Sequence, residues 1–385
     1  MRVGVYSDLL YREQEGTVST DLSFVRLVAS LPPRVSEVVV FGRLHPEPGR
    51  EPYALPHDGV RFVPLPYYPS VWAAGAVARS VAGSCRTLAR ELEGLDALWL
   101  FGPNPLVLPF ALVARARGVP LALGVRQDYP AYVAARAPGS RRWPAIAAAH
   151  ALERSFRLLA RRAPTVALGE ELARSYRGGR AGVLATGFSL VRAGDVVPLD
   201  EALARSWDGE LRLLTVGRLD AEKNPLLLPE IVARLDARWH LTVVGEGPLR
   251  EEVLRHAREA GASDRIELVG HVENGPPLWE RYRSSHAFLH VSLTEGLPQV
   301  LFEAQAAGLP VVATDVGGVR AGFAGSALVV PARDPAAAAA ALARLAADSR
   351  LRAELIRSSI EHARVETLDA QLDRIVAFLR SELEV

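Results

Sequence analysis

Residues 211–225 read Leu-Arg-Leu-Leu-Thr-Val-Gly-Arg-Leu-Asp-Ala-Glu-Lys-Asn-Pro. The apolar run Leu211–Val216 predicts a buried strand, and Pro225 is typical of the first residue of a helix. The polar loop between them begins at Gly217 and carries two cations. A strand that leads through a loop into a helix is the unit that repeats along the chain in α/β folds with a parallel sheet. In such sheets ligands bind at the carboxyl ends of the strands, which is where this loop lies.

The same alternation runs through the rest of the chain. Near-continuous apolar runs predict strands that are buried on both faces, and the stretches between them predict covering helices. In the first half we expect strands at 2–7, 37–42, 60–65, 97–102, 120–125, 165–168 and 182–185, with helices at 20–30, 71–92, 106–117 and 145–162. In the second half we expect strands at 211–216, 240–244, 266–269, 287–291, 310–313 and 327–330, with helices at 225–235, 249–260, 278–284, 299–307, 335–347 and 368–383.

A polar stretch without any strand-like run, residues 192–209, separates the two halves. We expect a first doubly wound domain over 1–191, a hinge over 192–209 and a second domain over 210–365, with the ligand cleft between the domains. The last helix carries Leu368, Leu372, Ile375, Val376 and Leu379 on one face. We expect residues 366–385 to return and pack on the first domain.

Composition excludes several classes of protein. The 385 residues include 45 basic and 44 acidic side chains, a balance that argues against a surface built for nucleic acid. No apolar run reaches the roughly 18 residues of a membrane span, and the N-terminus does not resemble a signal peptide, so we expect a cytoplasmic protein. Cys85 is the single cysteine, which excludes an intrachain disulfide and a cysteine-based zinc cluster.

Lys223 is the one lysine among those 45 cations, so the other 44 are arginines. It shares the loop after the 211–216 strand with Arg218. A compact ammonium, a guanidinium and the free amides of a helix N-terminus suit a polyanion such as a diphosphate. The alternative is a surface loop with two solvated cations.

A second pattern follows the apolar strand at 287–291. It reads Glu295-Gly-Leu-Pro-Gln-Val-Leu-Phe-Glu303, with a turn between two carboxylates. This order offers carboxylates to hydroxyl groups beside free amides for phosphate. Spacing alone does not separate a catalytic pair from a salt-bridged one, because Glu is common near helix N-termini.

Together these motifs resemble glycosyltransferase family 4, whose members are retaining enzymes of the GT-B fold. The residues that carry the resemblance are 217–223, Val244-Gly-Glu-Gly-Pro-Leu249, Val269-Gly-His-Val272, the pair Glu295 and Glu303, and Ala313-Thr-Asp-Val-Gly-Gly318. They are specific over about residues 211–331. Before residue 190 only the alternating architecture supports the family.

The resemblance implies a metal-independent hexosyltransferase that takes a nucleoside-diphosphate sugar, with UDP or GDP as the nucleotide. Arg218 and Lys223 would hold the diphosphate and stabilise the leaving group. Glu295 would contact sugar hydroxyls, and Glu303 the ribose. The remaining implied donor contacts are Gly217, Gly245, Gly247, Val272 and the amides of Gly296 and Leu297. Retention by front-face attack does not require a pair of carboxylates for double displacement.

The first half departs from the family pattern. Its first loop offers only Glu15-Gly16-Thr17, so Gly16 is the candidate phosphate contact there. After the 120–125 strand, where many members have a histidine, this chain has Arg126-Gln127-Asp128. We expect Arg126 on the acceptor side, and Asp128 either as a catalytic group or as a helix cap. The acceptor would be a small molecule, a glycan or a lipid-linked compound.

Two further patterns have simple interpretations. His271, His286 and His290 lie near strands without a carboxylate at ligand spacing, so we interpret them as structural and expect no bound metal. The basic amphipathic stretch Arg141–Arg162 suits peripheral membrane contact, but a helix that covers a sheet needs the same apolar stripe, and we favour the helix. The alternatives to transfer are a nucleotide-sugar epimerase and a non-catalytic nucleotide-sugar-binding protein.

Overall fold

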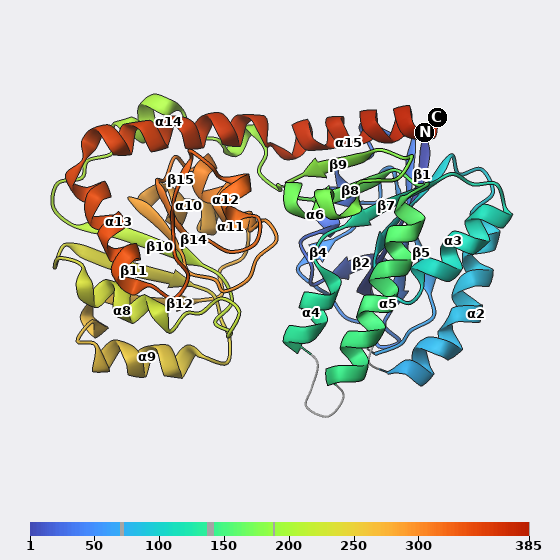
Figure 1. Ribbon diagram of the computed structural model, residues 1–385, viewed down its shortest axis with the longest axis horizontal. Helices are drawn as coiled ribbons and strands as arrows, with labels where there is room; N and C mark the ends of the chain where they lie inside the picture. Colours follow the sequence, from blue (N-terminus) through green and yellow to red (C-terminus); the bar gives the residue numbers. More distant parts are fainter. Residues whose placement is uncertain (70–72, 137–141, 188, 385) are drawn as a thin grey trace. The chain divides into compact units, whose positions relative to one another are not determined.

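The computed structural model describes residues 1–69, 73–136, 142–187 and 189–384 (Figure 1). The chain divides into two compact units. The first unit comprises Met1–Phe188 and Gln371–Val385, and the second comprises Ser189–Ala370.

The first unit is built on a parallel sheet of seven strands, with two short antiparallel strands at one end. The parallel strands lie in the order β5-β3-β1-β6-β7-β8-β9. Chain order therefore reverses between β1 and β6, which makes this the topological switch point of the unit. The strands are β1 (Arg2–Gln14), β3 (Glu37–Leu44), β5 (Val60–Leu65), β6 (Ala97–Gly102), β7 (Leu121–Val125), β8 (Thr165–Leu168) and β9 (Val183–Thr186).

Helices of this unit pack on its sheet around a large hydrophobic cluster. Tyr6, Phe41, Phe110 and Phe156 are almost completely buried in it. The helices are α1 (Val25–Ala29), α2 (Ala74–Glu91), α3 (Val107–Ala116), α4 (Tyr129–Arg136), α5 (Arg142–Ala160), α6 (Glu170–Tyr176) and α15 (Leu368–Leu383). Val71, the first residue expected in the second helix of the chain, lies outside the described residues.

Helix α15 lies beside β9, and its contacts belong to the first unit (Figure 1). Asp373 accepts a hydrogen bond of 2.6 Å from Nε of Arg34. Glu382 accepts one of 2.8 Å from the amide of Gly182, just before β9. Leu372 and Ile375 are fully buried, so the apolar face of the last helix is packed.

The first strand differs from the prediction. It continues past Ser7 to Gln14, turns at Glu15 and Gly16, and returns as the antiparallel strand β2 (Thr17–Thr20), which pairs with β4 (Tyr53–Ala54). Both turn residues have positive φ, 53° and 76°, as a two-residue hairpin turn requires. The expected strand-to-helix loop at Gly16 is therefore wrong, and the helix expected at 20–30 is reduced to α1.

The second unit has six parallel strands in the order β12-β11-β10-β13-β14-β15. This is the doubly wound order, and it places a topological switch point between β10 and β13. Helix α8 packs against α13, and α11 packs against α14. The strands are β10 (Leu211–Val216), β11 (Trp239–Val244), β12 (Ile266–Gly270), β13 (Ala287–His290), β14 (Val311–Thr314) and β15 (Ala327–Val330). The helices are α7 (Leu199–Leu203), α8 (Leu227–Arg234), α9 (Arg250–Glu259), α10 (Pro276–Ser284), α11 (Gln299–Ala306), α12 (Val319–Gly322), α13 (Pro335–Ala347) and α14 (Ser349–Val365).

The segment expected as a hinge, residues 192–209, is folded onto the second unit. It contains α7, whose Ala202 is buried with Val197, Ile356 and Ile360 in a small cluster beneath α14. The amide of Val197 also donates a 2.9 Å hydrogen bond to the carbonyl of Ala306. A rotation about this segment stays a prediction.

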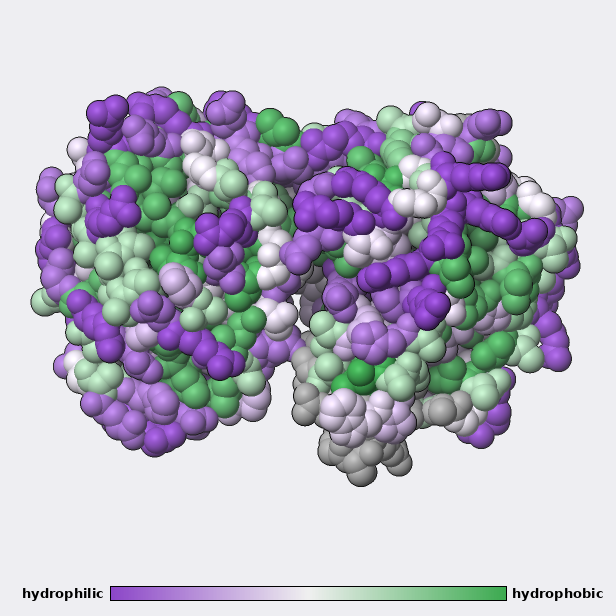
Figure 2. Space-filling view, viewed as in Figure 1, coloured by the Kyte–Doolittle hydropathy of each residue, from purple (hydrophilic) through white to green (hydrophobic). Residues whose placement is uncertain are grey.

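The basic stretch at 141–162 forms most of α5, although Arg141 lies outside the described residues. Its Phe156 is 1% exposed and packs edge-on to Tyr176, as a helix that covers a sheet requires, whereas Trp143 is 78% exposed. In the view of Figure 2, hydrophilic and hydrophobic residues are interspersed over the surface of each unit. Within the described residues, no helix has the length and apolar character needed to cross a bilayer.

Candidate functional site

Three polar residues singled out in the second half, Arg218, Lys223 and Glu295, meet at its topological switch point. The loop after β10 and the loop after β13 line a cavity of about 310 Å³. Gly217, Arg218 and Lys223 come from the first loop, and Glu295 and Leu297 from the second. Residues 72 positions apart in sequence thus share one site because β10 and β13 are neighbours in the sheet.

The loop after β10 is shaped by its own acidic residues. Asp220 accepts a 3.2 Å hydrogen bond from the amide of Lys223 through Oδ1, and its Oδ2 lies 2.9 Å from Nη1 of Arg218. Nη2 of Arg218 lies 3.4 Å from Oε2 of Glu222. The Arg218 side chain is 61% exposed, so these ion pairs are solvent-screened and worth less than about 1 kcal/mol each. The guanidinium can therefore turn to a stronger anion at little cost.

Two glycines allow neighbouring loops to touch the site backbone. Gly245 has φ of +140°, and a Cβ there would lie 1.9 Å from the carbonyl oxygen of Gly217. Gly317 has φ of +51°, and a Cβ there would lie 1.8 Å from the carbonyl oxygen of Glu295. A side chain at either position would displace a site loop. Gly247 is similar, because its Cβ would lie 2.4 Å from the carbonyl oxygen of Leu219.

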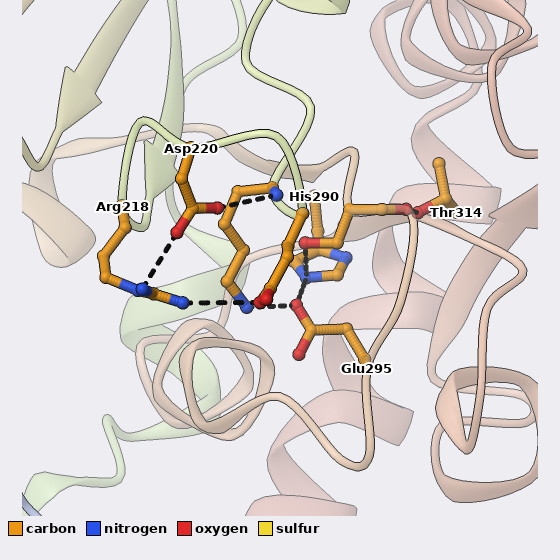
Figure 3. A network of polar contacts seen from close by, with 8 residues as sticks. Arg218, Asp220, His290, Glu295 and Thr314 are labelled. Atoms are coloured by element: carbon orange, nitrogen blue, oxygen red, sulfur yellow. Dashed lines mark hydrogen bonds and ion pairs between the residues drawn. The ribbon is translucent and has the colours of Figure 1, made fainter. Parts of the chain in front are cut away.

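The centre of the site is a network around Glu295 (Figure 3). Its Oε1 accepts hydrogen bonds from Nζ of Lys223 at 2.5 Å and from Nε2 of His290 at 3.0 Å. Burial favours the neutral acid, but the hydrogen bond from His290 and the charge of Lys223 outweigh it and lower the pKa of Glu295 to about 2. Glu295 is therefore ionised at neutral pH. Because two donors occupy Oε1, the other oxygen, Oε2, is the one left for a ligand.

The interpretation of His290 as a histidine without a carboxylate partner is wrong. Glu295 reaches it from an irregular loop. A carboxylate only accepts, so Nε2 of His290 carries the proton, and Oγ of Ser292 lies 3.0 Å from the same nitrogen. Nδ1 is sealed from solvent without a partner among the described residues.

His286, in contrast, has the structural role expected. Its Nδ1 accepts from the amide of Arg212 at 2.9 Å, and its Nε2 lies 3.0 Å from the carbonyl of Ser206. Burial lowers its pKa to about 4, so it is neutral at pH 7. His271 is exposed just after β12. Among the described residues, no three His, Cys, Asp or Glu side chains are grouped as metal ligands would be.

Backbone donors complete the cavity. The amides of Gly296 and Leu297 make no hydrogen bond within the described part of the chain, and they lead into the first turn of α11. The carbonyl of Gly296 is fixed by the amide of Gly318 at 3.0 Å. Free amides before a helix suit an anionic oxygen. Leu297 lines the same cavity as Lys223, and a contact between these two amides and a ligand stays a prediction.

Glu303 and Val272 lie away from this cavity. Glu303 is 8% exposed in α11, and its Oε2 accepts a 2.7 Å hydrogen bond from the hydroxyl of Tyr282 in α10. Val272 is partly buried in the loop after β12. Neither residue is among those that line the 310 Å³ cavity. Their contacts with ribose and base stay predictions.

In the first unit, the three residues singled out have different surroundings. Gly16 is at the tip of the β1–β2 hairpin, and its phosphate contact stays a prediction. Asp128 caps α4, because its Oδ1 accepts a 2.9 Å hydrogen bond from the amide of Ala131. It also lines a cavity of about 650 Å³ between α4 and α5. Arg126 directly follows β7 and stacks on the ring of Phe24, 4.3 Å from its centroid.

Sequence reasoning missed Asp220, His290 and Ser292 as parts of the site. The signal for Asp220 was present, since it stands three residues before Lys223 in the loop already chosen. His290 ends the strand that leads to Glu295, and a polar residue at the carboxyl end of a buried strand is itself a signal.

A family model and a relative of known name indicate the family of the chain. Residues 210–348 match the family model described as glycosyl transferases group 1. A GDP-mannose-dependent alpha-mannosyltransferase of Mycolicibacterium smegmatis is 30% identical over 340 residues, covering 83% of this chain and 81% of that protein. The chain belongs to the group 1 glycosyltransferases, family 4. The expected family is thereby confirmed.

Other relatives of this glycosyltransferase match over shorter stretches. The D-inositol 3-phosphate glycosyltransferase of Thermomonospora curvata is 34% identical over 182 residues, or 43% of this chain and 41% of the relative. The matches to the inositol-phosphate enzymes span less than half the length of those relatives.

Solved structures confirm the fold class. A sucrose-phosphate synthase from Thermosynechococcus elongatus superimposes with a TM-score of 0.72 at 19% identity, covering 99% of this chain and 98% of that one. HepE of Anabaena, solved in complex with UDP, superimposes with a TM-score of 0.72 at 15% identity, covering 99% of this chain and 100% of HepE. The glycosyltransferase thus has the expected GT-B class of two doubly wound α/β domains. The cleft between them stays a prediction.

Proposed function

We propose that this glycosyltransferase moves a sugar from a nucleoside diphosphate to an acceptor hydroxyl, with retention of configuration and without a metal. The single observation that carries the proposal is the contact between Lys223 and Glu295 at the switch point of the second unit. It joins a cation suited to a diphosphate with a carboxylate suited to sugar hydroxyls in one 310 Å³ cavity.

The charges of the site fit a donor that carries its own negative charge next to hydroxyl groups. One ammonium hydrogen of Lys223 points to Glu295, which leaves two for phosphate oxygens. Arg218 is exposed and turns easily from its carboxylates to a diphosphate. The amides of Gly296 and Leu297 supply neutral donors beside them.

In the transfer step, the bond between the sugar and the diphosphate breaks and negative charge collects on the leaving oxygen. A fixed cation beside that oxygen stabilises the charge as it forms, which is worth about 10²–10³ in rate for one preorganised donor. Lys223 is fixed by Glu295 and by the turn that Asp220 closes. Glu295 in turn keeps Oε2 toward the sugar, because Lys223 and His290 occupy Oε1.

We further propose that the second unit binds the donor and the first binds the acceptor. UDP and GDP are the nucleotides we favour. A solved neighbour holds UDP and a relative is named for GDP-mannose, so the two remain equal candidates. One relative, from Campylobacter jejuni, is named for a diphospho-undecaprenol compound, and another, from Thermomonospora curvata, for D-inositol 3-phosphate. Lipid-linked, glycan and small-molecule acceptors all stay within the proposal.

A donor screen tests the proposal. UDP-, GDP- and ADP-sugars are incubated with the protein, with and without pooled acceptors, and release of the nucleotide is followed. We expect one nucleotide to be released faster with acceptor, and Lys223→Ala to lower that rate. An epimerase would convert the donor sugar without releasing nucleotide, and a binding protein would release none.

A further inference from the structure

The first unit has a polar cluster of its own at the carboxyl edge of its sheet. Asp8 lies in β1 after its buried start, Arg43 is the last residue but one of β3, and Arg126 directly follows β7. Strand β1 lies at the topological switch point, next to β6. This is the equivalent place to the Lys223–Glu295 site in the second unit, and nothing in the donor assignment uses these residues.

Asp8 is held with one oxygen occupied and one free. Its Oδ1 accepts from Nε of Arg43 at 2.7 Å and from the hydroxyl of Tyr68 at 2.6 Å. Arg43 is only 7% exposed, and its guanidinium lies 4.2 Å from the centroid of the Tyr68 ring. The other carboxylate oxygen, Oδ2, has no partner among the described residues, although the side chain is 15% exposed. Asp8 therefore presents one fixed acceptor to a hydroxyl group.

Arg126 is a cation without a carboxylate. Within the described chain, no carboxylate oxygen lies within 4.0 Å of its guanidinium, which rests on the ring of Phe24. Three other arginines of this unit each pair with an acidic side chain: the partly buried Arg2 and Arg61, and the buried Arg43. Burial lowers the pKa of Arg126, while Tyr11, Tyr132 and Asp8 act electrostatically in the opposite direction. A guanidinium stays charged in proteins, so Arg126 lacks a counter-charge that a ligand can supply.

We propose that Asp8 and Arg126 select an acceptor that carries both a hydroxyl group and an oxyanion, such as a phosphate ester or a carboxylate. Arg126 binds the oxyanion, and Oδ2 of Asp8 accepts a hydrogen bond from an acceptor hydroxyl. The sheet register pairs Tyr6 of β1 with Leu100 of β6, and Leu100 with Leu123 of β7, so Asp8 and Arg126 come from the same edge of the sheet on strands two positions apart. At a strand spacing of about 4.8 Å, the two strands are about 10 Å apart, a distance that a sugar carrying an oxyanion can span. This inference rests on the proposed function, because it names the acceptor class of the same reaction.

Kinetic selectivity tests it. With the donor found in the screen, kcat/KM is measured for sugar phosphates, sugar acids and the matching neutral sugars. We expect wild type to prefer an anionic acceptor over its neutral counterpart, and Arg126→Gln to reduce that ratio about 10- to 100-fold, the scale of losing a charge-assisted hydrogen bond. The class of acceptor with the higher kcat/KM, sugar phosphates or sugar acids, identifies the oxyanion that Arg126 binds.

The control is Arg115→Gln, which removes an exposed arginine from α3 in the same unit. It should leave the ratio unchanged. If Arg126 instead bound the donor diphosphate, Arg126→Gln would lower kcat/KM by the same factor for anionic and neutral acceptors. The ratio of the two kcat/KM values would then stay unchanged. That result, or a wild-type preference for neutral acceptors, would overturn the proposal.

A binding measurement keeps the test independent of turnover. Inorganic phosphate is titrated into Lys223→Ala protein, in which the predicted donor site has lost its lysine. We expect binding that weakens at least 10-fold when Arg126→Gln is added. Equal binding by the single and double variants overturns the site even if no donor is ever turned over. If phosphate binding depends on Arg126 while no donor is consumed, the proposed function fails and the anion site stands.

Discussion

Replacing His290 with leucine tests the network around Glu295. Leucine nearly fills the volume of the ring but removes the 3.0 Å hydrogen bond from Nε2 to Oε1. A hydrogen bond to a charged group contributes about 1.5–3 kcal/mol, which corresponds to about a 10- to 150-fold loss of kcat/KM if the bond orients Glu295 for the donor. Lys223 still contacts Oε1 in the variant, so the loss should be smaller than that of Lys223→Ala.

The pH dependence separates orientation from protonation. Glu295 has a pKa of about 2, and loss of one donor raises it toward the ordinary value near 4.3. The carboxylate therefore stays ionised above pH 6 in wild type and variant, so protonation of Glu295 does not contribute to the loss of kcat/KM measured between pH 6 and pH 8.

Steady-state kinetics with the identified donor measure the effect of His290→Leu, and thermal unfolding checks that the variant is folded. His271→Leu is the matched control, because His271 is an exposed histidine in the same unit. A loss below about threefold in folded His290→Leu, or an equal loss in His271→Leu, would refute the orienting role.

Four other outcomes are expected. Lys223→Ala should lower kcat by about 10²–10³-fold, and Lys223→Arg should not restore it, because a planar fork replaces a point charge; near-normal kcat in either variant would remove the leaving-group role. Glu303→Ala should weaken binding of a ribonucleotide donor more than of its deoxyribose analogue in calorimetry, whereas equal weakening would indicate a structural carboxylate. Because the folded-state pKa of His286 is about 4, below the unfolded value near 6.5, the free energy of unfolding should fall as pH drops from 6.5 to 4, by up to about 1.4 kcal/mol per pH unit. A denaturant series on His286→Asn should show a shallower slope, and parallel slopes would contradict the assignment. Deletion after Glu366 removes α15 and should reduce hydrogen-exchange protection in the first unit, whereas loss confined to the second unit would contradict the packing of α15.

Most strands could be predicted well because each is a short apolar run that ends at polar or glycine residues. The limits of β5, β6, β8 and β10 agree with the sequence pattern residue for residue. The extension of β1 was missed because Leu9–Gln14 mixes apolar and charged residues, and its pairing with β2 depends on the turn at Glu15 and Gly16. Helix α14 was missed as well. Its capping residue Asp348 accepts from the amide of Leu351, a signal that was present in the sequence.

The site was only partly predictable, for a topological reason. Lys223 and Glu295 were each chosen from their own loops, but their contact requires β10 and β13 to be neighbours. His290 was dismissed because no regular spacing joins it to a carboxylate. The irregular loop after β13 brings Glu295 back onto it across five residues. Arg43, in β3, and Tyr68, in the loop after β5, hold Asp8, and neither belongs to a local sequence motif.

The most direct test of the central claim is equilibrium binding of UDP and GDP, measured by calorimetry on wild type and on Lys223→Ala. The account predicts that wild type binds one of the two nucleotides at a single site, and that Lys223→Ala binds it at least 10-fold more weakly, because a charge-assisted contact to phosphate is lost. Absence of binding to wild type, or equal affinity in the two proteins, would contradict the assignment of the Lys223–Glu295 cavity to the donor.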